Sequence, residues 1–196
     1  MSLLIKKHFK KLFTSDIEVL KTVDDYCILI IFKNGRTSCC KYATNNKLSF
    51  LGNKKIKNVN LINVFLRDPK ERFMSGVNSY RIFNNIILNK EFLQDIEKFK
   101  LVDKHFVPQI FYLFHLYKLY KGKIKIHSLK DLKKYIPNHD KPHPGTTFTE
   151  KQKKLIRSIN CEEYIRDDLT LIKRYMGETV NLSKIIREFK YVLSSS

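Results

Sequence analysis

A lysine, a glycine and two hydroxyl side chains follow one another closely after an apolar run. The run covers residues 26–32, and Lys33-Asn34-Gly35 and then Arg36-Thr37-Ser38 come directly after it. Asn and Gly favour a tight turn, and Thr or Ser favours the start of a helix. Backbone N–H groups converge at such a turn, the helix dipole adds partial positive charge, and Lys33 adds a full one. These residues predict an anion-binding site; an ordinary strand-to-helix turn is the alternative interpretation.

A second group of charged and hydroxyl side chains follows the apolar run Leu61–Leu66 and reads Arg67-Asp68-Pro69-Lys70-Glu71-Arg72-Phe73-Met74-Ser75. Pro69 suits the first turn of a helix and Asp68 suits its N-cap, so a helix is expected over residues 70–85. Arg67 and Ser75, eight residues apart, can then converge on one anion. Two anion sites would lie along the carboxyl edge of one sheet, which predicts a ligand with two separated phosphate-like groups.

The elements that must position these residues alternate between strands and helices. Apolar runs predict strands over 26–32 and 61–66, each buried on both faces, and the alternating residues 123–127 predict a less buried or edge strand. Apolar periodicity and capping residues predict helices over about 37–45, 70–85, 92–99, 106–117, from 128, from 149, 162–175 and 182–193. This pattern favours one α/β domain with a parallel sheet flanked by helices, with residues 1–24 as a lead-in, 25–175 as the core and 176–196 as a C-terminal helix.

Charge and composition narrow the class of partner. The chain has 196 residues, 38 Lys and Arg against 19 Asp and Glu, and a net charge of +19. A polyanion or a multiply charged ligand is therefore the expected partner, and a solvated lysine-rich surface is the alternative. The cysteines form neither a disulfide framework nor a zinc spacing (Cys27, Cys39, Cys40, Cys161). With no signal peptide and no apolar stretch of about 20 residues, a cytoplasmic protein without a membrane span is expected.

Three stretches resemble the sulfotransferases that use 3′-phosphoadenosine 5′-phosphosulfate (PAPS), closest to the carbohydrate O-sulfotransferase branch. Residues 32–38 match the family's 5′-phosphosulfate loop, a strand followed by Lys-x-Gly-x-Thr. Residues 64–75 match its 3′-phosphate motif, Arg-Asp-Pro-x-x-Arg-x-x-Ser. Residues 104–109 resemble its His-x-x-Pro-Gln segment, and residues 141–147 carry a weaker likeness. The resemblance spans about residues 26–175 and implies a P-loop-like α/β fold.

The resemblance also implies roles for individual residues. Lys33 would stabilise charge on the leaving phosphate during sulfuryl transfer. The 5′-phosphosulfate would be held by backbone N–H groups and hydroxyls of the loop (Asn34, Gly35, Arg36, Thr37, Ser38). Arg67 and Ser75 would grip the 3′-phosphate, and Lys141 would add a contact to it or lie in a solvated loop. The donor would be PAPS and the product adenosine 3′,5′-bisphosphate (PAP), and no metal is required.

The acceptor hydroxyl needs a general base. Many family members place this base shortly after the phosphosulfate loop, but residues 39–66 contain no His, Asp or Glu. His105 is therefore the candidate base or substrate-orienting group, and a partly buried structural histidine is the alternative. The other histidines are weaker candidates: His127 beside a strand end, His115 in an apolar helix, and His139 and His143 in a proline-rich loop. An aromatic helix face could stack on a sugar, although such spacing is more often core (Tyr112, Phe114, Tyr117, Tyr120).

Three functions are compatible with these residues. The expected one is transfer of a sulfuryl group to a hydroxyl acceptor, a carbohydrate of which acidic glycans are one class, by a bacterial, phage or viral enzyme. The second is a basic nucleic-acid-binding protein, although no helix-turn-helix, zinc-finger or RNA-sheet signature is visible. The third is a catalytically degenerate family member that binds nucleotide or glycan, because the usual base after the loop is missing.

Overall fold

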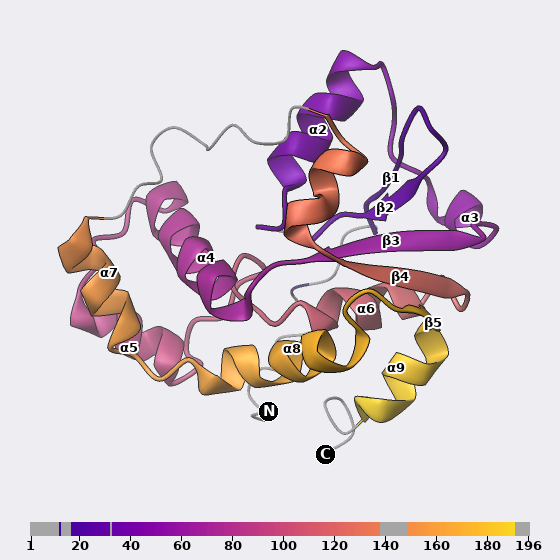
Figure 1. Ribbon diagram of the computed structural model, residues 1–196. Coiled ribbons are helices and arrows are strands. Elements are labelled where there is room, and N and C mark those ends of the chain that lie inside the picture. Colours follow the sequence, from indigo (N-terminus) through magenta and orange to yellow (C-terminus); the bar gives the residue numbers. More distant parts are fainter. Residues whose placement is uncertain (1–11, 13–16, 32, 138–148, 191–196) are drawn as a thin grey trace.

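A five-stranded sheet forms the centre of the molecule in the computed structural model, which describes residues 12, 17–31, 33–137 and 149–190 (Figure 1). The strands are β1 (Val19–Lys21), β2 (Cys27–Leu29), β3 (Leu61–Leu66), β4 (Lys123–Ser128) and β5 (Thr179–Asn181), and their order in the sheet follows the chain. The three central strands are parallel, whereas β1 and β5 run antiparallel to their neighbours. The α/β class is confirmed, and the expected parallel sheet is found in its three central strands, whereas both edge strands reverse direction.

The edge strands were not expected from the sequence. Residues 1–24 were interpreted as a lead-in, but Val19 and Leu20 are fully buried and β1 forms a hairpin with β2. The N–H of Thr22 donates to the carbonyl of Tyr26 at 2.8 Å and closes this hairpin. Residues 176–196, interpreted as a C-terminal helix, include β5, which pairs with the first half of β4.

Residues 123–127 were predicted to form a less buried or edge strand; the strand is less buried than β3, but it is not an edge strand. These residues lie in β4, which pairs with β3 on one side and β5 on the other, and Ile124 and Ile126 are fully buried. Lys123 is exposed and Lys125 is partly buried, which produces the alternating pattern. Because polar alternation reports only exposure of one face, it could not reveal that both edges are paired.

Helices cover both faces of the sheet. Their bounds are α2 (Arg36–Asn45), α3 (Asn53–Ile56), α4 (Pro69–Phe83), α5 (Lys90–Glu97), α6 (Ile110–Tyr117), the 3₁₀ helix η1 (Leu129–Lys134), α7 (Glu150–Arg157), α8 (Glu162–Tyr175) and α9 (Leu182–Glu188). Asp68 caps α4 by accepting from the N–H of Glu71 at 2.8 Å, as its sequence position predicts. Thr149 and Gln152 form the expected capping box of α7. None of the helices in the described part of the chain is long and apolar enough to cross a bilayer.

The core is divided by the sheet into two apolar clusters. Alternate residues of the first run face opposite sides: Leu29 and Ile31 belong to the larger cluster with α4, α6, α8 and α9, and Ile28 and Ile30 belong to the smaller one with α2 and η1. In Figure 1, α2 lies above the sheet and α6, α8 and α9 lie below it. The prediction that this run is buried on both faces is therefore confirmed for residues 27–31, whereas Tyr26 is exposed.

Candidate functional site

The loop after β2 makes a tight turn into α2. Lys33 and Gly35 have positive φ angles of 67° and 81°, and Gly35 is the N-cap of α2. No side chain caps this helix and its first turn holds no acidic residue, so its leading N–H groups suit an anion. The buried side chain of Asn34 donates to the carbonyl of Phe65 at 2.8 Å and to Oε1 of Gln109 at 2.5 Å. The loop is thereby attached to the end of β3.

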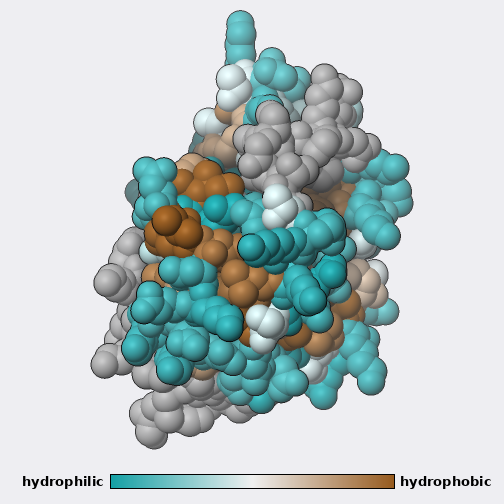
Figure 2. Space-filling model, turned by 90° about the vertical axis from the view of Figure 1, so that its left-hand side faces the viewer, coloured by the Kyte–Doolittle hydropathy of each residue, from teal (hydrophilic) through white to brown (hydrophobic). Residues whose placement is uncertain are grey.

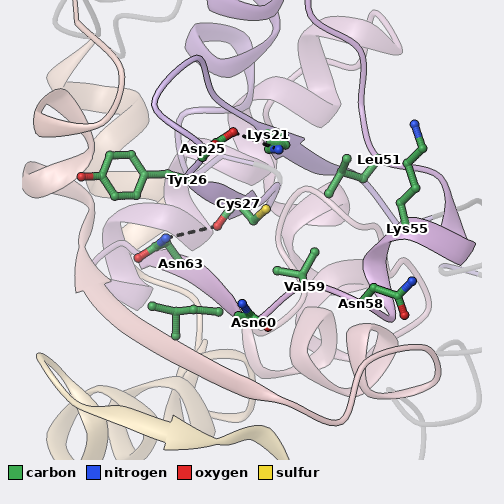
Figure 3. A pocket seen from close by; sticks show the side chains of 11 residues that line it. Lys21, Asp25, Tyr26, Cys27, Leu51, Lys55, Asn58, Val59, Asn60 and Asn63 are labelled. Atoms are coloured by element: carbon green, nitrogen blue, oxygen red, sulfur yellow. Dashed lines mark hydrogen bonds and ion pairs between the residues drawn. The ribbon is translucent and has the colours of Figure 1, made fainter.

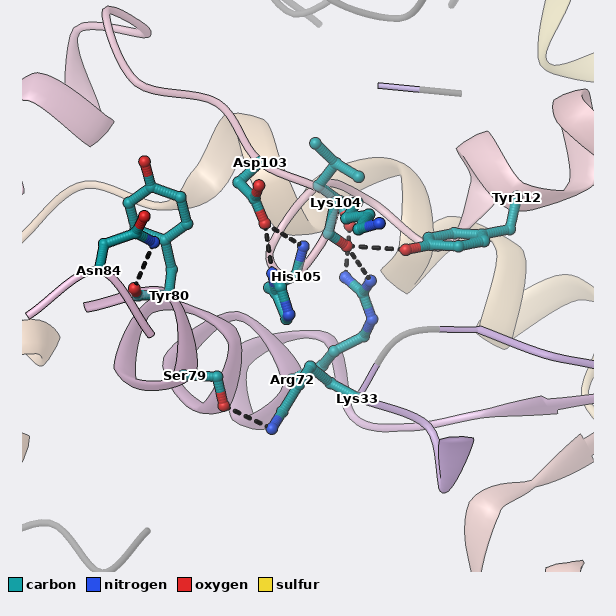
Figure 4. A network of polar contacts seen from close by, with 10 residues as sticks. Lys33, Arg72, Ser79, Tyr80, Asn84, Asp103, Lys104, His105 and Tyr112 are labelled. Atoms are coloured by element: carbon teal, nitrogen blue, oxygen red, sulfur yellow. Dashed lines mark hydrogen bonds and ion pairs between the residues drawn. The ribbon is translucent and has the colours of Figure 1, made fainter. Parts of the chain in front are cut away.

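The side chain of Lys33 crosses to α4. Its Nζ donates to Oγ of Ser79 at 2.6 Å (Figure 4). Burial and the nearby positive charges of Arg67 and Arg72 lower the pKa of Lys33 from its usual value. The ammonium group of the first motif therefore lies within the electrostatic field of the second, as expected for loops that follow two adjacent parallel strands.

Arg67 and Ser75 lie at the end of β3 and on α4, respectively. Arg67 directly follows β3, and its guanidinium group is 3.6 Å from the carboxylate of Glu71. Ser75 is on α4 and is partly buried. The structure thus brings Lys33 and Arg67 into one electrostatic environment, with Ser75 two turns into the helix that starts beside them.

The first turn of α2 carries the remaining loop residues. Arg36 binds the carboxylate of Glu18 through two hydrogen bonds of 2.9 and 2.7 Å, so its side chain is directed to β1 and its flank rather than to the turn. Thr37 is exposed and Ser38 is partly buried. Lys141 lies outside the described residues, as do His139 and His143.

His105 forms a carboxylate–imidazole pair that the sequence interpretation missed. Its Nδ1 is 2.5 Å from Oδ1 of Asp103, and its backbone N–H donates to the same oxygen at 2.8 Å (Figure 4). Burial alone would raise the pKa of Asp103, but these hydrogen bonds lower it below its usual value. An ionised Asp103 orients the imidazole ring, and the Asp-x-His spacing was the available sequence signal.

One stripe of α4 connects His105 to Lys33. Arg72, Gly76, Ser79 and Phe83 recur at helical spacing and therefore share a face. The ring of Phe83 is 5.9 Å from that of His105, and a Cβ atom on Gly76 would lie only 2.1 Å from the carbonyl oxygen of His105. Since Lys33 reaches Ser79, one turn beyond Gly76, His105 and Lys33 contact neighbouring turns of the same helix face.

Arg72 is a further residue that sequence reasoning missed. Its side chain is fully buried, and its guanidinium group donates to the carbonyls of Val107 and, at 3.4 Å, Lys104. It holds the 104–107 segment, which carries His105, against α4. The sequence feature that could have identified Arg72 is its place as the second arginine of the motif that runs from Arg67 to Ser75.

The other candidate side chains contribute mainly to packing. His127 is buried, stacks on Phe65 and places Nε2 2.9 Å from Oδ1 of Asn63; burial lowers its pKa. His115 is partly buried on α6. Most of the aromatic face considered for sugar stacking is buried in the core (Tyr112, Phe114, Tyr120), and Tyr117 is partly buried.

Two hollows in the surface of the described part of the chain lie away from Lys33. A cavity of about 500 Å³ opens at the amino ends of β2 and β3, with Tyr26, Lys55 and Asn63 in its lining (Figure 3). Another hollow, of about 900 Å³, lies between the end of α4 and α5.

Exposed apolar side chains occur at the C-terminal end of α4 and just after it (Ile82, Phe83, Ile87). On the face over α4, α5 and α7, Figure 2 shows apolar side chains gathered near the middle. The described residues contain no group of metal-binding side chains.

Comparisons with known proteins found no counterpart: no family model, no curated protein and no solved structure matches the chain.

Proposed function

We propose that this protein is a PAPS-dependent sulfotransferase with a P-loop-like fold that transfers a sulfuryl group to a hydroxyl. Acidic carbohydrates are the first acceptors to test. One observation carries the proposal: Lys33 reaches Ser79 on α4, where Arg67 and Arg72 are close enough to lower its pKa. Two cationic loops at the carboxyl edge of adjacent parallel strands are complementary to a ligand with a 5′-phosphosulfate and a 3′-phosphate.

The proposed reaction is an in-line displacement at sulfur. The acceptor oxygen forms the new S–O bond while the S–O bond to the 5′-phosphate breaks, and PAP leaves. Lys33 stabilises the negative charge that develops on the leaving phosphate. His105 accepts the proton of the acceptor hydroxyl at Nε2, because Nδ1 faces Asp103, and Asp103 stabilises the imidazolium that forms.

Calorimetric titration with PAP tests the donor site, with ADP as the matched nucleotide that lacks a 3′-phosphate. We expect micromolar or tighter binding of PAP, weaker binding of ADP, and a loss of affinity in Arg67→Ala. Equal affinity for the two nucleotides in the wild-type protein would contradict the proposal.

Transfer of labelled sulfuryl groups from PAPS to an acidic-glycan panel tests catalysis. Lys33→Ala should abolish transfer, and His105→Ala should lower kcat by about 10²- to 10⁴-fold with PAP affinity unchanged. A wild-type protein that binds PAP but transfers nothing would fit a degenerate binding protein.

The net charge of +19 favours nucleic-acid binding as a second candidate function. A phosphate-binding surface gives an affinity for duplex DNA that falls steeply with salt. Salt-sensitive DNA binding together with no PAP binding would favour this function over sulfuryl transfer.

A further inference from the structure

A single buried amide joins the two anion-binding loops. Oε1 of Gln109 accepts from Nδ2 of Asn34 at 2.5 Å and from the backbone N–H of Arg67 at 3.0 Å. Nε2 of Gln109 donates to the carbonyl of Arg67, also at 3.0 Å. Gln109 is fully buried, so water does not compete for these contacts. The loops after β2 and β3 are therefore linked through one side chain that belongs to neither.

Asp168 of α8 fixes the orientation of that amide. Its carboxylate accepts from the N–H of Gln109 at 2.6 Å, from Nε2 of Gln109 at 3.2 Å and from the N–H of Ile110 at 2.8 Å. A carboxylate only accepts hydrogen bonds, so Nε2 must face Asp168 and Oε1 must face the two loops. The same contacts bind N–H groups at the start of α6 and hold the segment that carries Gln109.

The charge of Asp168 is maintained inside the core. Burial raises the pKa of Asp168 to about 6, while the positive charge of Arg72 and the N–H donors of Gln109 and Ile110 oppose that rise. The group is therefore mostly ionised at neutral pH. An ionised carboxylate with several donors is a stiffer support than a neutral side chain, because each contact is charge-assisted.

We propose that Gln109, oriented by Asp168, is a positioning residue that sets the separation of the two anion-binding loops, and that this separation selects ligands with two phosphate groups spaced as in a 3′,5′-bisphosphate. The inference rests on the proposed donor site and adds what determines its selectivity. Gln109 contacts both loops but neither phosphate group of the predicted ligand. Its loss should therefore lower the affinity for a ligand that spans both loops more than the affinity for a ligand that occupies one loop.

Two variants and a matched control test this positioning role of Gln109 and Asp168, which we call the Gln109–Asp168 clamp. Gln109→Met keeps the approximate volume of the side chain and removes its hydrogen bonds. Asp168→Asn keeps the shape and introduces an N–H₂ group where donors converge. Tyr164→Phe is the control, because it removes a buried hydrogen bond to the carbonyl of Ile96 without altering a contact to either loop.

The readout is the affinity for PAP compared with that for AMP, which carries only the 5′-phosphate. We expect Gln109→Met and Asp168→Asn to weaken PAP binding by about tenfold or more and AMP binding by less than about threefold. Tyr164→Phe should change the ratio of the two affinities little. Equal losses for both nucleotides, or no loss for either, would overturn the clamp. If Asp168→Asn does not fold, Gln109→Met decides alone.

Hydrogen exchange separates failure of the clamp from failure of the proposed function. In the ligand-free protein, Gln109→Met should speed exchange in both 33–38 and 67–70, and Tyr164→Phe should not. A wild-type protein that binds neither nucleotide would refute the sulfotransferase proposal, and the clamp would then be judged by exchange. Unchanged exchange in both loops would refute the clamp itself.

Discussion

At the level of single side chains, Lys33 occupies surroundings that disfavour its own charge. Its ammonium group is partly buried near Arg67 and Arg72, and its backbone adopts a positive φ of 67°, which non-glycine residues rarely do. Such strained backbone conformations are common at ligand-binding sites. An anion bound between the loops would neutralise the repulsion, so the ligand-free protein is less stable here than the complex.

The lowered pKa of Lys33 predicts a pH dependence of stability. As the pH rises, Lys33 loses its proton in the folded protein before it does in the unfolded chain, where its pKa is 10.5. The free energy of unfolding should therefore rise with pH between the lowered pKa of the folded state and 10.5. The rise should be absent from Lys33→Met when denaturation curves are compared from about pH 8 to about pH 10.5. Saturating PAP should also suppress it in the wild-type protein. Parallel pH curves for the two ligand-free proteins would contradict the assignment.

For Asp168, the free energy of unfolding should change with pH in the opposite direction, and at acidic pH. Its pKa is raised from 3.8 to about 6, so the folded state retains the proton longer than the unfolded chain. The contribution of Asp168 to the free energy of unfolding should therefore fall as the pH rises from about 4 to about 6. The difference in unfolding free energy between wild type and Asp168→Asn, measured by urea denaturation, isolates this contribution. A difference that is independent of pH would show that Asp168 titrates normally.

At the level of elements, α4 acts as the common support of both motifs. Asp68 and Pro69 start the helix beside Arg67, Ser79 receives Lys33, and Gly76 lets the backbone of His105 approach closely. The 104–107 segment is held on the same stripe by Arg72. A small residue at position 76 is therefore a requirement of this packing, even though glycine is a poor helix former.

Gly76→Ala should destabilise the protein. Alanine favours a helix over glycine by about 1 kcal/mol, but its Cβ would lie 2.1 Å from the carbonyl oxygen of His105. We expect a net loss of about 1–3 kcal/mol in the free energy of unfolding, measured with urea. Gly52→Ala is the steric control, because a Cβ atom there meets nothing within 4 Å, and as an N-cap substitution it should cost no more than about 1 kcal/mol. Equal stability of the two variants would refute the close approach at Gly76.

At the level of the whole molecule, the net charge of +19 repels itself over a chain of 196 residues. Salt screens this repulsion over about 10 Å at 0.1 M. We therefore expect the melting temperature to rise between about 20 mM and about 200 mM sodium chloride. A melting temperature that falls over this range would mean that attractive ion pairs outweigh the net repulsion.

The sequence predicted the elements with strong local signals. β3 and α4 were predicted closely because an apolar run ends at Arg67 and a capping aspartate with a proline follows. The neighbouring positions of the two motifs followed from placing both at strand ends. β1 and β5 could not be predicted, because strands of three residues carry too little periodicity and depend on the pairing partner.

The support of the candidate site was mostly invisible in the sequence. Gln109 closes the His-x-x-Pro-Gln segment, but Asp168 lies 59 residues later in the middle of α8, so no local spacing connects the two residues. Asp103 and Arg72 were closer to detection because each lies within a few residues of a motif residue. Long-range hydrogen bonds between buried polar groups depend on the tertiary fold, which periodicity does not encode.

The arrangement of the strands also has a consequence for how the chain folds during synthesis. Because each strand lies beside the one that precedes it in the chain, the sheet can grow from β1 toward β5 as the chain emerges. Asp168, however, arrives on α8, after the loops that follow β2 and β3 and after Gln109 have been made. A nascent chain thus carries both loops before it carries Asp168. Under the proposed function, nucleotide binding would therefore mark completed folding.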